Sequence, residues 1–232
     1  MLPIAILAGG LATRLGSLTK NTPKCLLTVN GRPFIDLQLE LLRNAGYSDV
    51  ILCLSHHAEK VVNHVGSGER FGINLDFSFD GSRQLGTGGA LRKILSKVGP
   101  KFALIYGDSY LPIDYKKVED FFLESNMLGL MTVYENRNRF EKSNVTFSNN
   151  KVKIYNKTPS DGMTHIDYGL SYFQSEVFEP YPNNEPFDLA DVLSSLSIQG
   201  KLSGFEIYTR FYEIGSVRGI EDLSSYLKEH NR

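Results

Sequence analysis

Two adjacent glycines, Gly9 and Gly10, follow a short apolar run at residues 4–8 and precede two basic residues, Arg14 and Lys24. Glycine lets the backbone bend and approach a ligand closely, so that several N–H donors point toward one place. Arg14 offers a planar fork for phosphate oxygens, and Lys24 offers a compact ammonium that can follow charge as it develops on a phosphoryl group. The loop therefore suits a triphosphate.

Two further motifs stand where an apolar run meets a turn or a helix. Gly107 and Asp108 directly follow the apolar residues 102–106, and ligands of α/β sheets bind beyond the carboxyl ends of such strands. A second glycine-rich segment, residues 85–90, opens a predicted helix. By itself this segment is also explained by ordinary helix capping with Thr87 near the N-cap. Asp108 has a comparable alternative as a cap for the turn at Ser109.

The first half of the chain alternates strand and helix patterns. Continuous apolar runs predict strands at residues 4–8, 50–54, 75–79 and 102–106, and amphipathic patterns predict helices at 33–45, 58–65 and 85–98. Gly46 is a plausible stop for the first helix. This alternation indicates βαβ units with a parallel sheet.

The second half is less regular. Apolar patterns predict strands at residues 128–134, 144–147, 152–155, 166–173, 205–208 and 211–214, and helices at 189–196 and 220–230. Asn149 and Asn150 predict a hairpin turn. We expect one α/β domain over residues 1–232 with a mixed, mostly parallel central sheet. Residues 1–125 would form a nucleotide-binding half and residues 126–232 a half that covers the second substrate.

Composition excludes several classes of function. Lys and Arg number 25 against 26 Asp and Glu, so a nucleic-acid partner is not expected. Cys25 and Cys53 are too few for a disulfide framework and lack metal-ligand spacing, so both are expected to be small core residues in a reducing cytoplasm. No segment has the length of a membrane span and the start has no basic leader, which predicts a cytoplasmic protein without a membrane partner.

Taken in order from Ile4 to the sequence Glu213-Ile214-Gly215, these motifs resemble the sugar-1-phosphate nucleotidyltransferases, and most closely the heptose and hexose 1-phosphate guanylyltransferases. The resemblance implies a Rossmann-like, three-layer fold. It also implies that an NTP and a sugar 1-phosphate react to give a nucleotide sugar and pyrophosphate with the help of Mg²⁺. The resemblance is also compatible with a homodimer.

The resemblance also assigns roles along the first loop. Gly9 and Gly10 would cradle the nucleotide, Arg14 would hold the pyrophosphate end, and Lys24 would stabilise the pentacoordinate α-phosphate. Ala12 departs from the family, which usually has a second glycine there. The wider set of nucleotide-binding residues that the resemblance implies is Leu7, Ala8, Gly9, Gly10, Asp80, Leu85, Gly86, Thr87 and Gly88.

Two carboxylates are the implied metal ligands. Asp108 occupies the family's first ligand position, and Glu213 stands where relatives carry an aspartate. Glutamate keeps the charge and adds one methylene, although a glutamate near the end of a chain is often only a solvated side chain. Asp80 falls near the position that reads the base and could accept from guanine N1–H and N2–H₂ or from a cytosine amine. It could equally cap a turn with Gly81.

The second substrate would meet residues of the C-terminal half. The implied sugar-phosphate-binding residues are Gly107, Asn156, Lys157, Tyr168 and Gly169. Lys157 would meet the sugar phosphate, while Asn156 replaces the family's carboxylate with an amide. Gly169 would admit the sugar ring. For Tyr168, core packing is an equal alternative.

Two other functions stay open from the sequence. A cytidylyltransferase for a non-sugar phosphate such as phosphocholine would need an aromatic cage, for which Tyr155, Tyr168 and Tyr172 are candidates. A regulator that binds a nucleotide sugar without turnover is the other. The retention of Arg14, Lys24 and Asp108 argues against it, because binding alone would tolerate their loss more readily.

Overall fold

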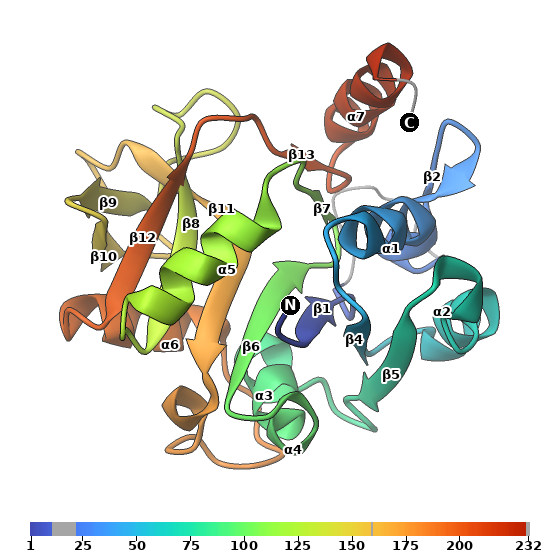
Figure 1. Ribbon diagram of the computed structural model, residues 1–232, viewed down its shortest axis with the longest axis horizontal. Helices are drawn as coiled ribbons and strands as arrows, with labels where there is room; N and C mark the ends of the chain where they lie inside the picture. Colours follow the sequence, from blue (N-terminus) through green and yellow to red (C-terminus); the bar gives the residue numbers. More distant parts are fainter. Residues whose placement is uncertain (11–21, 159, 231–232) are drawn as a thin grey trace.

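The computed structural model describes residues 1–10, 22–158 and 160–230, and these residues build a mixed α/β fold around a nine-stranded sheet (Figure 1). In chain order, the strands of this sheet are β1 (Ile4–Leu7), β4 (Asp49–Leu54), β5 (Asn74–Phe79), β6 (Lys101–Tyr106), β8 (Gly129–Glu135), β9 (Val145–Ser148), β10 (Lys151–Tyr155), β11 (His165–Gln174) and β12 (Leu202–Ile207). The α-helices are α1 (Phe34–Asn44), α2 (Ala58–Val65), α3 (Gly86–Lys93), α4 (Leu95–Val98), α5 (Tyr115–Glu124), α6 (Leu189–Ile198) and α7 (Val217–Glu229).

Shorter elements complete the described chain. Two small sheets pair β2 (Thr28–Val29) with β3 (Arg32–Pro33) and β7 (Ser109–Tyr110) with β13 (Tyr212–Glu213). The 3-10 helices are η2 (Lys24–Leu26), η3 (Glu69–Phe71) and η4 (Ser175–Phe178). Within the described part of the chain, no helix is both long and apolar enough to cross a membrane.

The main sheet has the order β5-β4-β1-β6-β11-β8-β12-β10-β9. Strands β5, β4, β1 and β6 are parallel, as the alternating pattern of the first half predicted. Strand β11 then runs antiparallel to both β6 and β8, and only β8 and β12 form a parallel pair in the second half. The expected mixed sheet is confirmed, but the expectation that it is mostly parallel is wrong for its strand pairings: among the described strands of this sheet, four pairings are parallel and five are antiparallel, because β9, β10 and β11 pair only antiparallel.

The register of the parallel strands defines one functional edge. Leu7, the last residue of β1, lies opposite Cys53 of β4 and opposite Tyr106 of β6. The chain therefore leaves β1 and β6 at the same level, which brings Gly9 and Gly10 to the same edge as Gly107 and Asp108. This is the edge at which ligands of parallel α/β sheets bind.

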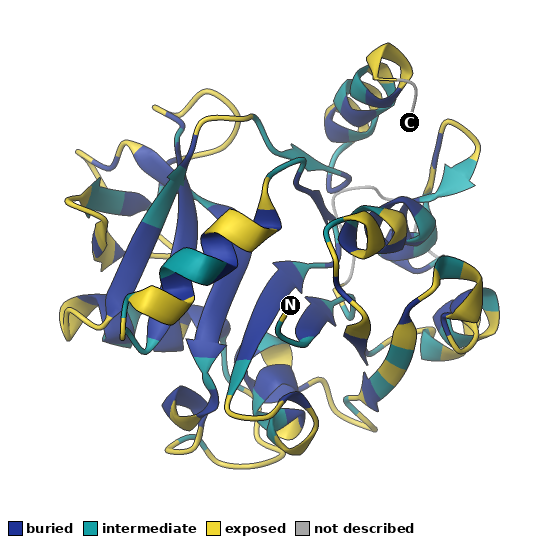
Figure 2. Cartoon of the chain, in the orientation of Figure 1, coloured by how far each residue is buried: buried dark blue, intermediate teal, exposed yellow. Residues whose placement is uncertain are grey.

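Alternation along the strands divides the core between two faces. In β1, Ile4 and Ile6 join the cluster that packs against α1, α2 and α5, whereas Ala5 joins the cluster that packs against α3, α4 and α6. Side chains of successive strand residues point to opposite faces, so both faces of a central strand are covered and its sequence reads as continuously apolar. Figure 2 shows the central strands buried and the outer faces of the helices exposed, which makes three layers.

Local signals explain where several elements begin and end. Asn149 and Asn150 both have positive φ values, 52° and 54°, as a tight hairpin turn between β9 and β10 requires. Helix α5 was not predicted, although Asp114 caps it by accepting from the backbone N–H of Lys117 at 3.1 Å. The helix predicted over residues 85–98 is divided at Ile94 into α3 and α4.

Candidate functional site

A pocket of about 570 Å³ lies at the edge where β1 and β6 end. Among its lining residues are eleven that the sequence singled out: Leu7, Ala8, Gly9, Gly10, Lys24, Asp80, Gly86, Thr87, Gly107, Asp108 and Lys157. They come from segments far apart in the chain, and those that follow β1, β5 and β6 meet because these parallel strands end at one edge of the sheet. Arg14 and Ala12 lie outside the described residues.

Close backbone approach shapes the floor of this pocket. The N–H of Ala8 donates to the carbonyl of Cys53 at 2.9 Å, and the N–H of Gly107 donates to the carbonyl of Leu7 at 3.0 Å. A Cβ on Gly107 would lie 2.7 Å from both the Leu7 carbonyl oxygen and the Ala8 Cα atom, so only glycine fits there. By contrast, a Cβ on Gly10 would meet no atom of the described residues within 4 Å, so none of them fills the space beside it.

The main charged contact in the pocket joins Lys24 and Asp108. The Lys24 ammonium forms an ion pair with the Asp108 carboxylate. The Lys24 side chain is 14% exposed and that of Asp108 is 33% exposed, so the pair is largely shielded from bulk water and its field is weakly screened. Lys24 opens η2, and the buried Cys25 anchors this short helix in the core.

A buried glutamine holds the backbone around Asp108. The side-chain amide of Gln38 in α1 donates to the carbonyls of Tyr106 and Ser109, at 2.9 and 2.8 Å. These two residues flank Gly107 and Asp108, so α1 fixes the turn that presents the carboxylate. Gln38 is not among the residues that the sequence singled out. Its place among the apolar residues of the predicted helix was the available signal, and the structure buries it fully.

Glu213 lies beside Asp108 because β13 pairs with β7. Glu213 is opposite Ser109 in this pairing, and the N–H of Ile214 donates to the Asp108 carbonyl at 3.0 Å. The Glu213 carboxylate accepts from the N–H of Gly215 and from the Ser216 hydroxyl, and Ser216 in turn caps α7. Glu213 thus also stabilises the turn into α7.

Asp108 and Glu213 are the two carboxylates that could share a magnesium ion with a substrate, although Asp108 lines the pocket and Glu213 does not. Lys24 Nζ and Glu213 Oε2 both lie within 3 Å of the position that a Cβ on Gly215 would occupy, so Lys24 stands next to both carboxylates. Among the described residues, no group of three or more His, Cys, Asp or Glu side chains is arranged to hold a metal ion. Mg²⁺ commonly binds through one or two carboxylates together with substrate phosphates and water. Asp108 and Glu213 would supply two such carboxylates.

The second glycine-rich segment serves a different purpose from the one expected. The resemblance to the nucleotidyltransferases placed Gly86 and Gly88 among the nucleotide-binding residues. In the structure, a Cβ on Gly86 would lie 2.6 Å from the Phe187 carbonyl oxygen, and a Cβ on Gly88 would lie 2.3 Å from the Phe187 ring. The glycines therefore admit the segment at residues 185–188, although Gly86 and Thr87 still line the pocket.

Residues next to these glycines also make their contacts within the protein. Leu85 is buried in the core, 2% exposed, and does not line the pocket. The Thr87 hydroxyl donates to Asp188 at 2.9 Å and accepts from the N–H of Leu189 at 2.8 Å. Asp80 lines the pocket and accepts from the N–H of Leu85 at 3.2 Å, so its carboxylate holds the backbone before α3.

The residues expected to meet the second substrate separate into two groups. Lys157 lines the pocket and pairs with Asp188. Gly169 has a φ of 109°, and a Cβ there would lie 3.2 Å from Ser109 Oγ, which places β11 beside the Asp108 turn. Asn156 does not line the pocket; its side-chain oxygen accepts from the N–H of Thr158 at 3.0 Å. Tyr168 is 2% exposed within the core, which is the packing alternative.

Comparison with known proteins decides the family. The family model described as "Nucleotidyl transferase" matches residues 4–224. The chain belongs to this nucleotidyl transferase family.

Curated members of the nucleotidyl transferase family resemble the chain over most of its length. A UTP–glucose-1-phosphate uridylyltransferase from Synechocystis is 26% identical over 91% of this chain. A D-glycero-α-D-manno-heptose 1-phosphate guanylyltransferase from Campylobacter jejuni is 29% identical over 81%. The chain spans 60% of the length of the first relative and 83% of the second.

Solved structures show the same fold. The crystal structure of HddC from Yersinia pseudotuberculosis has a TM-score of 0.82 at 24% identity and is matched over 98% of this chain and 100% of its own. A glucose-1-phosphate thymidylyltransferase described as putative, from Bacillus anthracis, has a TM-score of 0.86 at 21% identity. At these identities the likeness establishes the mixed α/β architecture.

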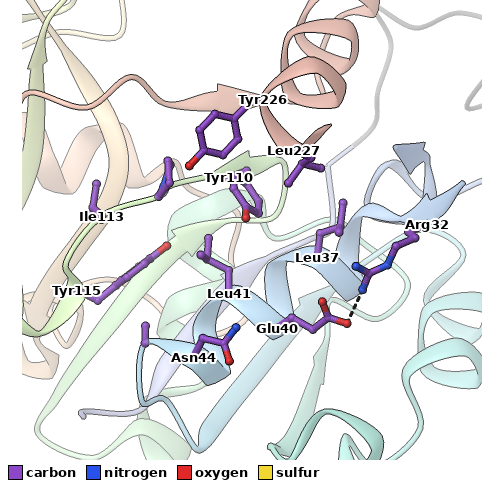
Figure 3. Close-up of a pocket in the computed structure, with 12 residues that line it drawn as sticks. Arg32, Leu37, Glu40, Leu41, Asn44, Tyr110, Ile113, Tyr115, Tyr226 and Leu227 are labelled. Carbon is purple, nitrogen blue, oxygen red and sulfur yellow. Dashed lines mark hydrogen bonds and ion pairs between the residues drawn. The ribbon is translucent and has the colours of Figure 1, made fainter. Parts of the chain in front are cut away.

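A second pocket, of about 590 Å³, has none of the described residues of the predicted site in its lining (Figure 3). Its walls come from β3, α1, β7, the segment between β7 and α5, the start of α5, and α7, including Leu41, Tyr110 and Tyr226. Arg32 and Glu40 form an ion pair at its rim. Although this second pocket is slightly the larger, neither the glycine loop nor Lys24 and Lys157 line it. The pocket at the end of β1 is therefore the candidate active site.

The carboxyl group of Asp167 has a raised pKa because it is buried. The Tyr106 hydroxyl, at the wall of the active-site pocket, donates to Asp167 Oδ2 at 3.1 Å, and the N–H of Gly169 donates to Oδ1 at 3.0 Å. Burial nevertheless raises the pKa of Asp167 from 3.8 to about 6. Because the folded state holds this proton more tightly than the unfolded state, stability is lost as the pH rises from about 4 to about 6.

Replacement of Asp167 by asparagine is therefore expected to stabilise the protein above pH 6. A pKa shift of this size corresponds to at most about 3 kcal/mol, and the gain should fall toward zero below pH 4. Urea unfolding of the parent and Asp167→Asn between pH 4 and pH 8 measures this. A stability difference that stays constant across the range would contradict it.

Substitution of alanine at Gly88 and at Gly10 should separate packing from ligand contact. Gly88→Ala is expected to lower the free energy of unfolding by about 1–3 kcal/mol, because its Cβ overlaps the Phe187 ring. Gly10→Ala is expected to change it by less than about 0.5 kcal/mol and to raise the KM for the nucleotide instead. Thermal unfolding and steady-state kinetics measure both. Equal stability of the two variants would refute the packing role of Gly88.

Proposed function

We propose that this chain transfers a nucleoside monophosphate from an NTP to a sugar 1-phosphate and releases pyrophosphate. The observation that carries the proposal is that one pocket joins the glycine loop, the Lys24–Asp108 pair and Lys157. Two anions must meet for this reaction, and the pocket supplies two ammonium groups from different segments. The proposal includes a division of labour between residues 1–125, which hold the nucleotide, and residues 126–232, which hold the acceptor.

The reaction would be an in-line attack by an acceptor phosphate oxygen on the α-phosphorus, with pyrophosphate leaving on the opposite side. In such a reaction the protein mainly positions groups and neutralises charge. The N–H groups of Gly9 and Gly10, for which no acceptor is found among the described residues, would donate to phosphate oxygens of the nucleotide. Lys24 would stabilise the charge that accumulates on the α-phosphate.

Further groups would complete the arrangement. Asp108 and Glu213 would hold Mg²⁺, which supplies positive charge to the phosphates. Lys157 would bind the phosphate of the acceptor and keep its attacking oxygen near the α-phosphorus. Arg14, outside the described residues, would hold the departing pyrophosphate. Asp80 would face the base from the pocket wall.

For the substrates we propose GTP and a heptose or hexose 1-phosphate. Support comes from the motif pattern and from the named guanylyltransferases among the relatives, including mannose-1-phosphate guanyltransferases of yeasts that are 35% identical over half of this chain. The phosphocholine alternative loses its structural basis. Tyr155, Tyr168 and Tyr172 are 7%, 2% and 0% exposed, and Tyr155 packs on the opposite face of the sheet from the other two. They cannot form one cage.

A pyrophosphate-release screen tests the proposal directly. Each NTP would be paired with a panel of sugar 1-phosphates and with non-sugar phosphates, in the presence of Mg²⁺. We expect release with GTP and a heptose or hexose 1-phosphate. Release only with CTP and a non-sugar phosphate would establish the alternative, and a nucleotide bound tightly without release from any pair would indicate a regulator.

A further inference from the structure

Asp188, which no motif of the sequence singled out, lies at the junction of the two halves of the pocket. It is the N-cap of α6, and its Oδ1 accepts from the N–H of Ala190 at 3.0 Å and from the Thr87 hydroxyl at 2.9 Å. Its other oxygen forms an ion pair with Lys157. One side chain therefore contacts α3, which lines the nucleotide side, the start of α6, and the lysine on the acceptor side.

This network exceeds what a helix cap needs. Asp114, the N-cap of α5, accepts from one backbone N–H, that of Lys117. Asp188 makes the equivalent cap with one oxygen and directs the second toward the pocket, where Lys157 lies. Burial pushes the pKa of Asp188 upward, but the hydrogen bonds from Ala190, Lys157 and Thr87 outweigh it and hold that pKa below its ordinary value. Asp188 is therefore ionised at neutral pH.

Lys157 needs such a restraint. Its side chain is 69% exposed, and an exposed lysine samples many rotamers because its four-carbon stem is flexible. Within the described chain, Asp188 is the only carboxylate that the structure places within ion-pair distance of it. Asp188 is itself held by its hydrogen bonds with Ala190 and Thr87. These bonds therefore also fix where the ammonium of Lys157 lies.

We propose that Asp188 is a positioning residue, which holds Lys157 over the acceptor end of the pocket and ties it through Thr87 to the nucleotide-lining helix α3. This inference rests on the proposed function, since it assumes that Lys157 meets an acceptor phosphate. A contact with that phosphate exists before and during the reaction. Its loss therefore affects acceptor binding more than the chemical step.

Replacement of Asp188 by asparagine tests the proposal. Asparagine keeps an oxygen for Ala190 and Thr87 but loses the charge that holds Lys157. We expect the KM for the sugar 1-phosphate to rise about tenfold, with the KM for the NTP and kcat changed less than twofold. Asp188→Ser, which caps the helix but is too short to reach Lys157, should give the same split. Asp114→Asn is the matched control and should leave all three constants unchanged.

A double-mutant cycle separates positioning from a general structural effect. In a Lys157→Ala background, Asp188→Asn should not raise the acceptor KM further, because the group that it positions is gone. An acceptor KM that is unchanged or lower in Asp188→Asn would overturn the proposal and show that Asp188 only offsets the charge of Lys157. Additive effects in the double variant would overturn it as well. A parent protein that turns over no substrate pair would instead refute the proposed function, and this inference with it.

Discussion

Lys24→Ala is expected to reduce turnover about 10²–10³-fold while leaving the fold intact. Lys24 is the shielded ammonium at the glycine loop, and it contacts Asp108 and borders Glu213. Preorganised charge aimed at a developing oxyanion contributes this much in enzymes, because it needs no reorganisation during the reaction. Since the charge is needed mainly in the transition state, kcat should fall more than the KM for the NTP rises. Pyrophosphate release under saturating substrates measures the effect.

A control for Lys24→Ala is available on the surface. Lys116 forms an ion pair with Asp120 on α5, and it lies outside the pocket. Lys116→Ala removes an ammonium from a carboxylate in the same way and should leave turnover within twofold of the parent. Thermal unfolding of both variants would show that the fold is retained. Near-normal turnover by Lys24→Ala would remove Lys24 from the proposed mechanism.

Asp108→Asn is expected to reduce turnover about 10²–10³-fold and to weaken the dependence of rate on Mg²⁺. The substitution keeps the size of the side chain but removes the charge that binds a divalent cation and pairs with Lys24. The backbone around it should hold, because Gln38 and Ile214 contact main-chain carbonyls of this turn. Rate measured against Mg²⁺ concentration, together with circular dichroism, tests both parts.

Glu213→Gln provides the comparison for the metal assignment. Glu213 uses a separate oxygen for each of its two bonds; in glutamine the amide oxygen can accept from Gly215 and the amide NH₂ can donate to the Ser216 hydroxyl, so α7 should keep its cap. The Mg²⁺ concentration for half-maximal rate should rise about tenfold, with a smaller loss at saturating metal. A metal titration that matches the parent would assign Glu213 to the α7 turn alone. Unaltered turnover of Asp108→Asn would contradict the proposed site as a whole.

Local sequence determined the parallel half of the sheet and much of the pocket. The central strands are covered on both faces, so their continuous apolar runs are visible without a structure. Chemistry-bearing residues that directly follow such strands must meet at one edge when the strands are parallel. Gly10 and Asp108, which follow β1 and β6, line one pocket for this reason, and Lys24 lines it with them. The turn at Asn149 and Asn150 could be predicted from the sequence as well, because its positive φ values are a local property of these two residues.

The residues that hold the site together could be predicted only in part from the sequence. In the sequence, Gln38 is a polar residue within a predicted helix and Asp188 precedes another, and their roles depend on which backbone or side chain another segment brings to them. Tyr168 could face a sugar or the core, and the packing of β11 against its neighbours places it in the core. Such choices are made by long-range contacts, which no local pattern encodes.

The sequence by itself determined the strand–loop chemistry of this protein: a glycine loop, a lysine and a carboxylate at the ends of buried strands. Only the tertiary structure decided why Gly86 and Gly88 are glycines, since the atom nearest to each belongs to Phe187, about a hundred residues away. It also decided that Lys157 is held by Asp188. The physical reason is that strand ends follow from local periodicity, whereas the space around a side chain is set by segments that the fold brings beside it.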